Sequence, residues 1–303
     1  MAKVPGLMKV LLTGGSGFIG KRCCEQLLLD GFEVLSISRS PTSILGVVAI
    51  VGDINNPDLT IEEAIGSFRP DVVLNLGWEG VANSEHGDPS QQNNLNGIPT
   101  IMSWAFQSGA KRWIGLGSQA EYGLINGVIS ETTQCNPVTE YGKAKLSACH
   151  LSERLAKELG LEWTWVRLFS CYGPGDDGKW LIPYTIRQLL AGQPVELTPG
   201  EQIWDYLYIQ DVVDALCLMT RKNVAGLYNL GSGFPVKIKD VALKLAQIIG
   251  RVELLEIGQK PYNHDQIMWM QADPTKIARD LGWRPKIKLD RGLQYTVEYH
   301  EAS

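Results

Sequence analysis

The first 170 residues alternate between short apolar segments rich in β-branched residues and longer segments with helical patterning. Strands are predicted at 9–13, 33–38, 47–52, 71–76, 112–117 and 163–169. Nearly continuous apolar strands are typical of a parallel sheet that helices cover on both faces. Helices are predicted at 20–31 and at 136–160, where Asn136 and Pro137 suit a helix start and Gly160 suits its end. The alternation predicts an α/β fold with a doubly wound parallel sheet.

The regular alternation ends after residue 170. A polar, glycine-rich segment occupies 171–180, and a strand-like segment at 226–231 fits a further strand of the sheet. Helical patterns follow at 182–192, 209–222 and 238–250, and an irregular tail is expected after them. Because doubly wound sheets bind ligands outside the carboxyl ends of their strands, we expect this smaller part to close over that edge.

The sequence TGGSGFIG at 13–20 directly follows the first predicted strand. Gly14, Gly17 and Gly20 stand three apart where the strand passes into a helix. Backbone N–H groups at a helix N-terminus bind phosphate oxygens, and a Cβ in such a turn would hold a pyrophosphate away from the backbone. The turn therefore predicts a dinucleotide site, and a tight turn without a ligand is the alternative.

The end of the second strand bears on which dinucleotide is bound. Cofactors with a free ribose 2′-hydroxyl are usually held by an acid at this place, but here Ser38 and Arg39 occupy it. A guanidinium matches a 2′-phosphate in charge and in geometry. We therefore predict that the cofactor is NADP(H), with NAD(H) as the alternative.

Tyr141 and Lys145 stand four residues apart in YGKAK, and so on one face of a predicted helix. An ammonium and the positive end of a helix dipole favour a phenolate, so we expect the pKa of Tyr141 to be lowered. Such a tyrosine exchanges a proton with a substrate oxygen. Ser118, at the carboxyl end of the fifth strand, is placed to polarise that oxygen. An exposed Tyr–Lys pair and a capping serine are the structural alternatives.

Charge and composition argue against several other roles. The net charge is -5 and no lysine- or arginine-rich block occurs, so nucleic acid is not an expected partner. Six cysteines form no CxxC pair and four histidines are scattered, so no metal site is expected. The apolar run near the first residue is too short to span a membrane and does not fit a signal peptide. We expect a cytoplasmic protein with reduced thiols.

Six motifs stand in an order and spacing that resemble one known family. They are TGGSGFIG, GDI at 52–54, GSQAEYG at 117–123, YGKAK at 141–145, RLFSCYGPG at 167–175 and ADPTKIARDLGWRP at 272–285. Together they resemble the extended short-chain dehydrogenase/reductase family, in its nucleotide-sugar epimerase/dehydratase/reductase branch.

The resemblance implies how the chain is divided. It implies a Rossmann-like dinucleotide-binding domain at 1–170 plus about 207–232. A smaller C-terminal domain, at about 171–206 plus 233–303, would bind a nucleoside-diphosphate sugar. It also implies a homodimer that packs two helices per subunit, here at about 92–109 and 137–159.

The resemblance also extends the expected cofactor site beyond the glycine turn. Asp53 and Ile54 would lie by the adenine, Phe169 would lie near the nicotinamide, and Asn94, on a helix, would support the site. The full set of expected cofactor contacts is Gly14, Ser16, Gly17, Phe18, Ile19, Ser38, Arg39, Asp53, Ile54, Leu76, Gly77, Trp78, Asn94, Tyr141, Lys145 and Phe169.

Departures from the family pattern narrow the reaction and define the expected substrate contacts. Related 4,6-dehydratases carry Thr-Asp-Glu where this chain has Ser118, Gln119 and an alanine, so dehydration is disfavoured, although Glu121 lies one residue beyond. Trp204 stands where an arginine usually contacts the substrate diphosphate, and Ser170 replaces a usual asparagine. The expected substrate contacts are Ser118, Gln119, Ser170 and Trp204.

These observations favour an NADPH-dependent ketoreductase of a nucleoside-diphosphate 4-keto-6-deoxyhexose, an enzyme of deoxysugar biosynthesis. Tyr141 would donate the proton, Ser118 would polarise the carbonyl, and Lys145 would hold the ribose and tune the tyrosine. The alternatives are a nucleotide-sugar 4-epimerase that retains its NAD, and a non-catalytic NADP-binding regulatory protein. Serine hydrolysis is not favoured, because Ser118 does not lie in a G-x-S-x-G turn.

Overall fold

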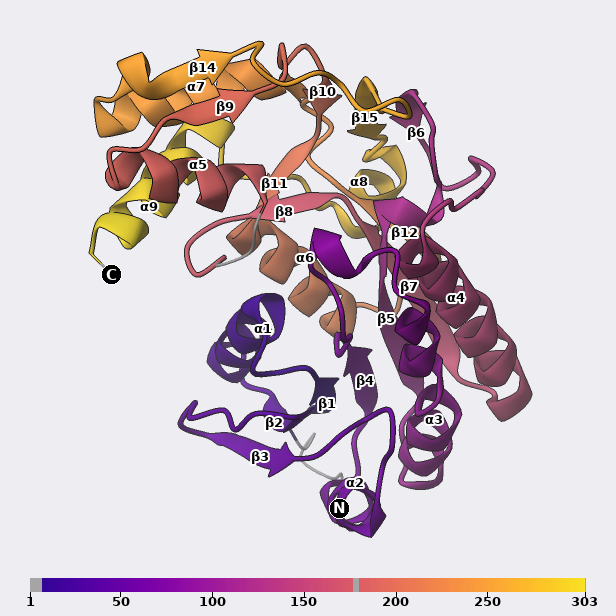
Figure 1. Ribbon diagram of the computed structural model, residues 1–303. Coiled ribbons are helices and arrows are strands. Elements are labelled where there is room, and N and C mark those ends of the chain that lie inside the picture. Colours follow the sequence, from indigo (N-terminus) through magenta and orange to yellow (C-terminus); the bar gives the residue numbers. More distant parts are fainter. Residues whose placement is uncertain (1–6, 177–179, 303) are drawn as a thin grey trace.

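The computed structural model describes residues 7–176 and 180–302, and a seven-stranded parallel sheet forms its centre (Figure 1). The strands are β1 (Lys9–Thr13), β2 (Glu33–Ser38), β3 (Val47–Val51), β4 (Val72–Asn75), β5 (Arg112–Ser118), β7 (Glu162–Leu168) and β12 (Gly226–Leu230). Their order is β12-β7-β5-β4-β1-β2-β3, so the direction of winding reverses between β1 and β4. The predicted α/β fold with a Rossmann-like doubly wound sheet is confirmed.

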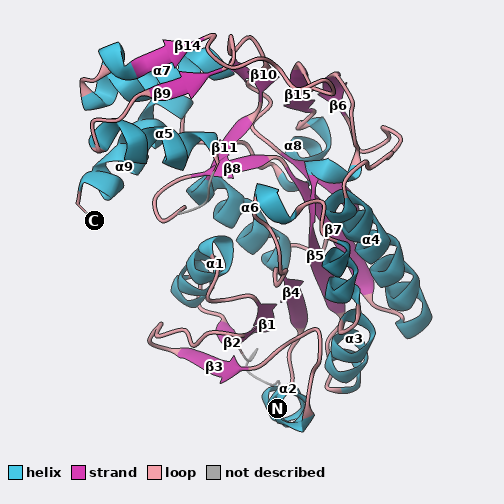
Figure 2. Cartoon of the chain, viewed as in Figure 1, coloured by secondary structure: helices cyan, strands magenta, loops and turns pink. Residues whose placement is uncertain are grey.

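Helices cover both faces of the sheet (Figure 2). They are α1 (Phe18–Leu29) and α6 (Ile209–Arg221) on one face, and α2 (Leu59–Phe68), α3 (Ile98–Gln107) and α4 (Glu140–Leu159) on the other. Val10 and Leu12 of β1 belong to the core under α1 and α6, whereas Leu11 belongs to the core under α2, α3 and α4. Successive side chains of a strand point to opposite faces, which is why apolar residues run on without a break.

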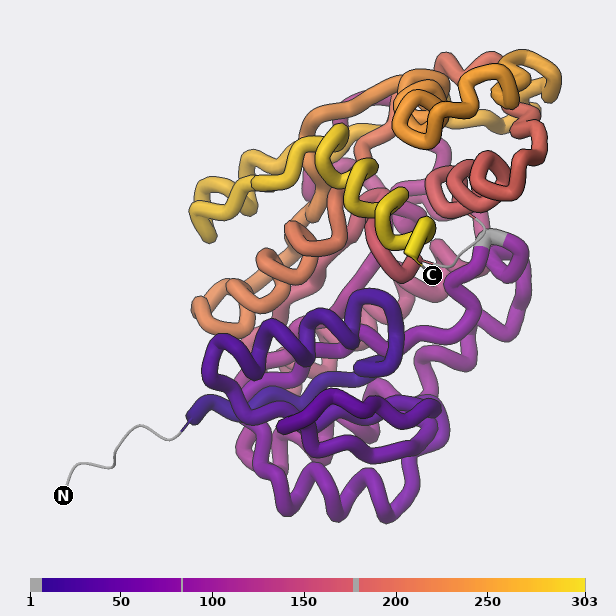
Figure 3. Tube along the Cα trace, turned by 90° about the vertical axis from the view of Figure 1, so that its left-hand side faces the viewer, coloured from indigo at the N-terminus to yellow at the C-terminus, as the bar shows by residue number. Residues whose placement is uncertain are grey.

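A second region lies beyond the carboxyl ends of the strands (Figures 1 and 3). Its helices are α5 (Leu181–Leu190), α7 (Ile238–Ile249), α8 (Thr275–Leu281) and α9 (Leu289–Glu301). Its strands are β6 (Gly127–Ile129), β8 (Ser170–Tyr172), β9 (Val195–Leu197), β10 (Ile203–Trp204), β11 (Tyr206–Tyr208), β13 (Val236–Lys237), β14 (Leu255–Ile257) and β15 (Trp269–Ala272). The 3₁₀ helices η1 (Asn83–Glu85), η2 (Pro89–Leu95), η3 (Gln119–Glu121) and η4 (Val252–Leu254) complete the described elements.

Several bonds tie the second region to the chain around the main sheet. β6, an excursion from the segment that follows β5, pairs with β15 in a four-stranded sheet of order β13-β10-β15-β6. The buried Asp205 carboxylate accepts hydrogen bonds from the backbone N–H groups of Ser232, Gly233 and Ala272, at 2.8–3.0 Å. The predicted division into two domains stays a prediction.

Two expectations about local structure were wrong. The helix predicted from residue 136 begins at Glu140, because the Thr139 hydroxyl accepts a hydrogen bond from the Gly142 N–H at 3.1 Å and so caps it. Its predicted end is confirmed, since Gly160 is the C-cap with φ of +74°. The tail is not irregular, because β15, α8 and α9 follow residue 250, and Leu293 and Val297 of α9 reach the core with helical spacing.

The predicted pair of dimer helices corresponds to α3 and α4, which pack against each other on one face of the sheet. Across the described residues, no helix combines the length and apolarity needed to cross a membrane. In the same part of the chain, no group of three or more His, Cys, Asp or Glu side chains is arranged to hold a metal ion.

Candidate active site

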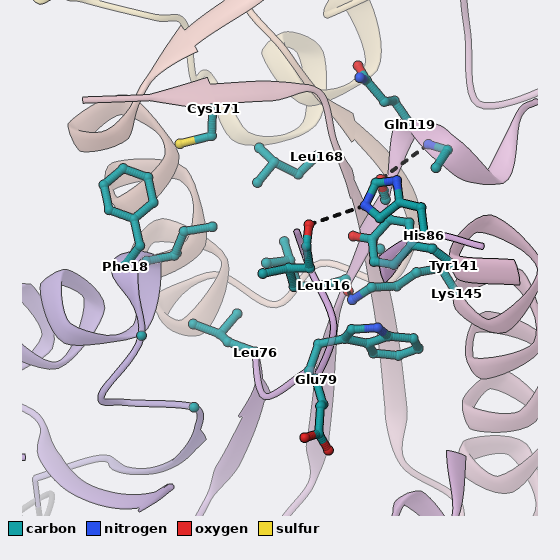
Figure 4. Close-up of a pocket in the computed structure, with 18 of the residues that line it drawn as sticks. Phe18, Leu76, Glu79, His86, Leu116, Gln119, Tyr141, Lys145, Leu168 and Cys171 are labelled. Carbon is teal, nitrogen blue, oxygen red and sulfur yellow. Dashed lines mark hydrogen bonds between the residues drawn. The ribbon is translucent and has the colours of Figure 1, made fainter. Parts of the chain in front are cut away.

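A cavity of about 780 Å³ lies at the carboxyl edge of the sheet, between the glycine turn, the start of α4 and the second region (Figure 4). Parallel strands end level here, because Thr13 pairs with Ile37 of β2 and with Asn75 of β4. Every residue predicted for the site lines this cavity, with the exception of Asn94. The fold thus brings together residues that lie far apart in the sequence, from Gly14 to Trp204.

The glycine turn forms a cradle that side chains would block. Gly14 has φ of +78°, and a Cβ there would lie 2.8 Å from the Gly77 Cα atom. A Cβ on Gly20 would lie 2.1 Å from the Gly14 carbonyl oxygen. Glycine at position 14 therefore lets the turn pack against the loop after β4, and glycine at position 20 lets α1 pack against the turn itself. Gly17, the N-cap of α1, lines the cavity. A backbone turn at a helix N-terminus fits the pyrophosphate of a dinucleotide.

Arg39, which directly follows β2, is paired with an acid from another strand end. Its guanidinium forms an ion pair with the carboxylate of Glu79, which follows β4, and both side chains are 56% exposed. The neighbouring Ser38 hydroxyl donates to the Ser40 carbonyl at 2.9 Å. The sequence pointed to Arg39 but gave no sign of Glu79, because the two residues are distant in the chain.

Asn94 lies on the 3₁₀ helix η2 and does not line the cavity itself. Its Oδ1 accepts from the Glu79 N–H at 2.7 Å, and its Nδ2 donates to the Glu79 carbonyl at 3.1 Å. It also donates to the Gln91 carbonyl at 3.1 Å and is 6% exposed. The predicted supporting position therefore fixes the backbone of Glu79.

Ser118, Tyr141 and Lys145 converge at the centre of the cavity. β5 ends at Ser118, and the first turns of α4 supply the other two. Lys145 Nζ donates to the Leu116 carbonyl at 2.8 Å and lies 3.7 Å from the centroid of the Trp78 ring. Tyr141 forms a side-chain hydrogen bond with Ser118. The spacing predicted this grouping, and the contacts with Leu116 and Trp78 come from the fold.

The expected lowering of the pKa of Tyr141 was wrong for this arrangement. Removal from water raises the pKa of Tyr141 to about 12, with the Glu121 charge acting in the same direction and the bond with Ser118 opposing it. Removal from water also lowers the pKa of Lys145 to about 7. Burial disfavours both charged forms, which is why the expected direction for Tyr141 was wrong.

The lowered pKa of Lys145 predicts a specific dependence of stability on pH. Between about pH 7 and pH 9 the unfolded chain, whose lysines titrate near 10.4, holds more protons at this residue than the folded chain. The free energy of unfolding of wild type, relative to Lys145→Met, should therefore rise with pH in this window. Urea denaturation of both proteins measures it, with exposed Lys143→Met as the control. A pH-independent difference would contradict the lowered pKa.

His86 belongs to the site and was missed by the sequence analysis. Its imidazole stacks on the Tyr141 ring, with centroids 4.2 Å apart and an interplanar angle of 3°. Its carbonyl accepts from the Tyr141 N–H at 3.0 Å, and its Nε2 lies 3.2 Å from the Val81 carbonyl oxygen. Burial lowers the pKa of His86, so the ring is neutral at pH 7. No motif covers the loop that carries His86, so only the fold reveals it.

Glu121 is turned away from the cavity. Its side chain is fully buried and accepts hydrogen bonds from the Ser118 N–H at 2.9 Å, from Trp165 Nε1 at 3.0 Å and from Arg167 Nε at 2.7 Å. The carboxylate is committed to these donors and is not among the residues that line the cavity. Glu121 therefore does not replace the acid that the dehydratase pattern requires.

Gln119, Ser170 and Trp204 form one polar wall of the cavity. Trp204 Nε1 donates to the Ser170 hydroxyl at 2.6 Å, and Gln119 Nε2 reaches the same oxygen at 3.3 Å. The Gln119 Oε1 atom is buried and finds no hydrogen-bond partner within the described part of the chain. A buried acceptor without a donor is unfavourable, so this wall is suited to a ligand that carries a hydroxyl group.

Comparison with known proteins agrees with this geometry. The NAD dependent epimerase/dehydratase family matches residues 10–231. The UDP-glucose 4-epimerase of Thermotoga maritima, solved with UDP-glucose, is 26% identical with a TM-score of 0.87, over 97% of this chain and 99% of that one. MoeE5, solved with UDP-glucuronic acid and NAD, is 28% identical with a TM-score of 0.87 and the same coverage.

A curated relative shows a similar likeness. The dTDP-glucose 4,6-dehydratase of Salmonella typhimurium is 24% identical over 98% of this chain and 93% of its own length. The chain belongs to the NAD dependent epimerase/dehydratase family, and is an oxidoreductase-type enzyme of the nucleotide-sugar branch of the extended short-chain dehydrogenases/reductases.

Proposed function

We propose that this enzyme transfers a hydride between a nicotinamide cofactor and a ring carbon of a nucleoside-diphosphate sugar, without eliminating water. The observation that carries the proposal is the convergence of Ser118, Tyr141 and Lys145 in one cavity, while Glu121 is held by Arg167 outside it. This convergence also argues against a non-catalytic regulator. Relatives solved with UDP-glucose or UDP-glucuronic acid support the substrate class.

The glycine cradle fits the pyrophosphate of NAD(P), and the predicted cofactor residues line the same cavity. When bound there, the nicotinamide supplies or accepts the hydride. In the reductive half of the reaction Tyr141, whose raised pKa keeps it protonated at neutral pH, protonates the sugar oxygen. In the oxidative half its phenolate would accept the proton of the sugar hydroxyl as the hydride leaves. Ser118 positions that oxygen, and Lys145 orients the cofactor ribose. Gln119, Ser170 and Trp204 would bind the sugar, with Gln119 Oε1 accepting from one of its hydroxyl groups.

Two finer reactions share this chemistry. We favour 4-epimerisation, in which the same carbon is oxidised and reduced again while NAD is retained, because Glu79 neutralises Arg39. The NADPH-dependent reduction of a 4-keto-6-deoxyhexose, predicted from Arg39, is the second candidate. Dehydration has relatives in its favour, but here Glu121 does not reach the cavity.

The test separates these reactions by their products. Purified protein is incubated with UDP-glucose, UDP-glucuronic acid or dTDP-glucose, or with a dTDP-4-keto-6-deoxysugar and NADPH, and the products are analysed by NMR. A 4-epimer formed without net change in nicotinamide absorbance supports the epimerase, and NADPH consumed in step with product supports the ketoreductase. A 4-keto-6-deoxy product from dTDP-glucose would contradict the proposal, because it requires loss of water.

A comparison at Trp204 tests the substrate wall. Trp204→Phe keeps an aromatic ring but removes the N–H that donates to Ser170. We expect KM for the sugar nucleotide to rise by about fivefold, since a neutral hydrogen bond contributes roughly 1 kcal/mol. The dinucleotide affinity should not change. Exposed Trp269→Phe is the matched control, and an unchanged KM in Trp204→Phe would remove this wall from the substrate site.

A further inference from the structure

We infer that Glu79, rather than a residue of β2, selects NAD over NADP in this enzyme. The inference rests on the proposed function, because it assumes that a dinucleotide lies along the cavity. Arg39 follows β2 and Glu79 follows β4, and β1 lies between those strands in the sheet. Their ion pair therefore crosses the carboxyl edge of the sheet in front of β1, the strand that leads into the glycine turn.

The position of Glu79 is fixed by buried polar groups. Asn94 holds both backbone polar groups of Glu79. Gln91, 2% exposed, holds the residues on either side, since its Oε1 accepts from Trp78 Nε1 at 2.9 Å and its Nε2 donates to the Gly80 carbonyl at 2.6 Å. The carboxylate of Glu79 points away from Tyr141 in Figure 4. The segment is thus built to present an acid to the end of β2, away from the reacting groups.

The charges around Arg39 and Glu79 then favour a ribose with a 2′-hydroxyl over one with a 2′-phosphate. Arg39 and Lys145 supply the lysine and arginine charge among the described cavity-lining residues, and Lys145 lies by Tyr141. A 2′-phosphate would have to displace Glu79 from Arg39 or bind beside its negative charge. A ribose 2′-hydroxyl can donate to the Glu79 carboxylate and leave the ion pair intact. Glu79 thereby takes the part of the acid that is missing from β2.

The exposure of both side chains makes the test direct. Exposed ion pairs contribute little to folding, so substitutions here should change binding and leave the fold in place. The test uses Glu79→Gln, with Glu85→Gln as the matched control, because Glu85 is an exposed acid on the nearby helix η1 and does not line the cavity. Binding of NAD⁺ and NADP⁺ is measured by calorimetry after copurified nucleotide has been removed.

The measured quantity is the ratio of the Kd for NADP⁺ to the Kd for NAD⁺. We expect Glu79→Gln to lower this ratio about tenfold, through tighter NADP⁺ and weaker NAD⁺ binding, and Glu85→Gln to leave it unchanged. Adding Arg39→Gln to Glu79→Gln should abolish the gain in NADP⁺ affinity. A ratio that Glu79→Gln leaves unchanged or raises would overturn the inference. A wild-type protein that binds neither dinucleotide would instead contradict the proposed function.

Discussion

Tyr141→Phe is expected to lower the rate of hydride transfer by about 10²–10⁴-fold, the range that a positioned acid or base contributes. The substitution keeps the ring that stacks on His86 and removes only the hydroxyl that bonds with Ser118. Single-turnover measurements of nicotinamide absorbance with a sugar nucleotide report the chemical step. Tyr295→Phe, on α9 outside the cavity, is the control and should behave like wild type.

A Tyr141→Phe protein with the wild-type rate would remove Tyr141 from the chemistry. The imidazole of His86 lies against the same ring and would then be the next group to examine. If Tyr141→Phe lowers the rate and His86→Phe keeps the wild-type rate, the histidine transfers no proton. Its ring then serves only to position Tyr141 by stacking. The two variants therefore separate proton transfer from ring packing.

Arg167→Met is expected to lower the free energy of unfolding by about 3–5 kcal/mol, the effect of breaking a buried ion pair. The variant leaves the fully buried Glu121 carboxylate without its cation, while Trp165 and the Ser118 N–H remain as donors. Because Glu121 also holds the Ser118 backbone, activity should fall as well. Urea denaturation followed by tryptophan fluorescence measures the loss of stability.

Two further variants make the stability result specific. Arg167→Met combined with Glu121→Leu removes both charges and should recover part of the lost stability, since no unpaired charge then remains. Arg279→Met breaks the exposed pair with Asp280 and should leave the unfolding free energy nearly unchanged. If Arg167→Met lowered the unfolding free energy as little as Arg279→Met does, the buried pair of Arg167 and Glu121 would not stabilise the site.

The fold and much of the site could be predicted because their signals are local. Strand-like runs, the glycines at 13–20 and the four-residue spacing of Tyr141 and Lys145 can all be read within a few residues of sequence. His86 and Glu79 could not be found in this way, since only tertiary packing brings them to Tyr141 and Arg39. The sequence also gave the wrong direction for the pKa of Tyr141, because spacing does not show how far burial removes a group from water.

The pairing of β6 with β15 has a consequence for how ligands enter and leave. A rigid opening of the second region away from the main sheet would have to break the hydrogen bonds that Asp205 makes with Ser232 and Gly233, which directly follow β12 of the main sheet. It would also have to carry β6, which the chain joins closely to β5, along with β15. Phe169 alone separates β7 of the main sheet from β8 of the second region. The chain therefore resists hinge opening, and under the proposed function we expect sugar and cofactor to exchange through movements of loops at the rim while the catalytic centre keeps its shape.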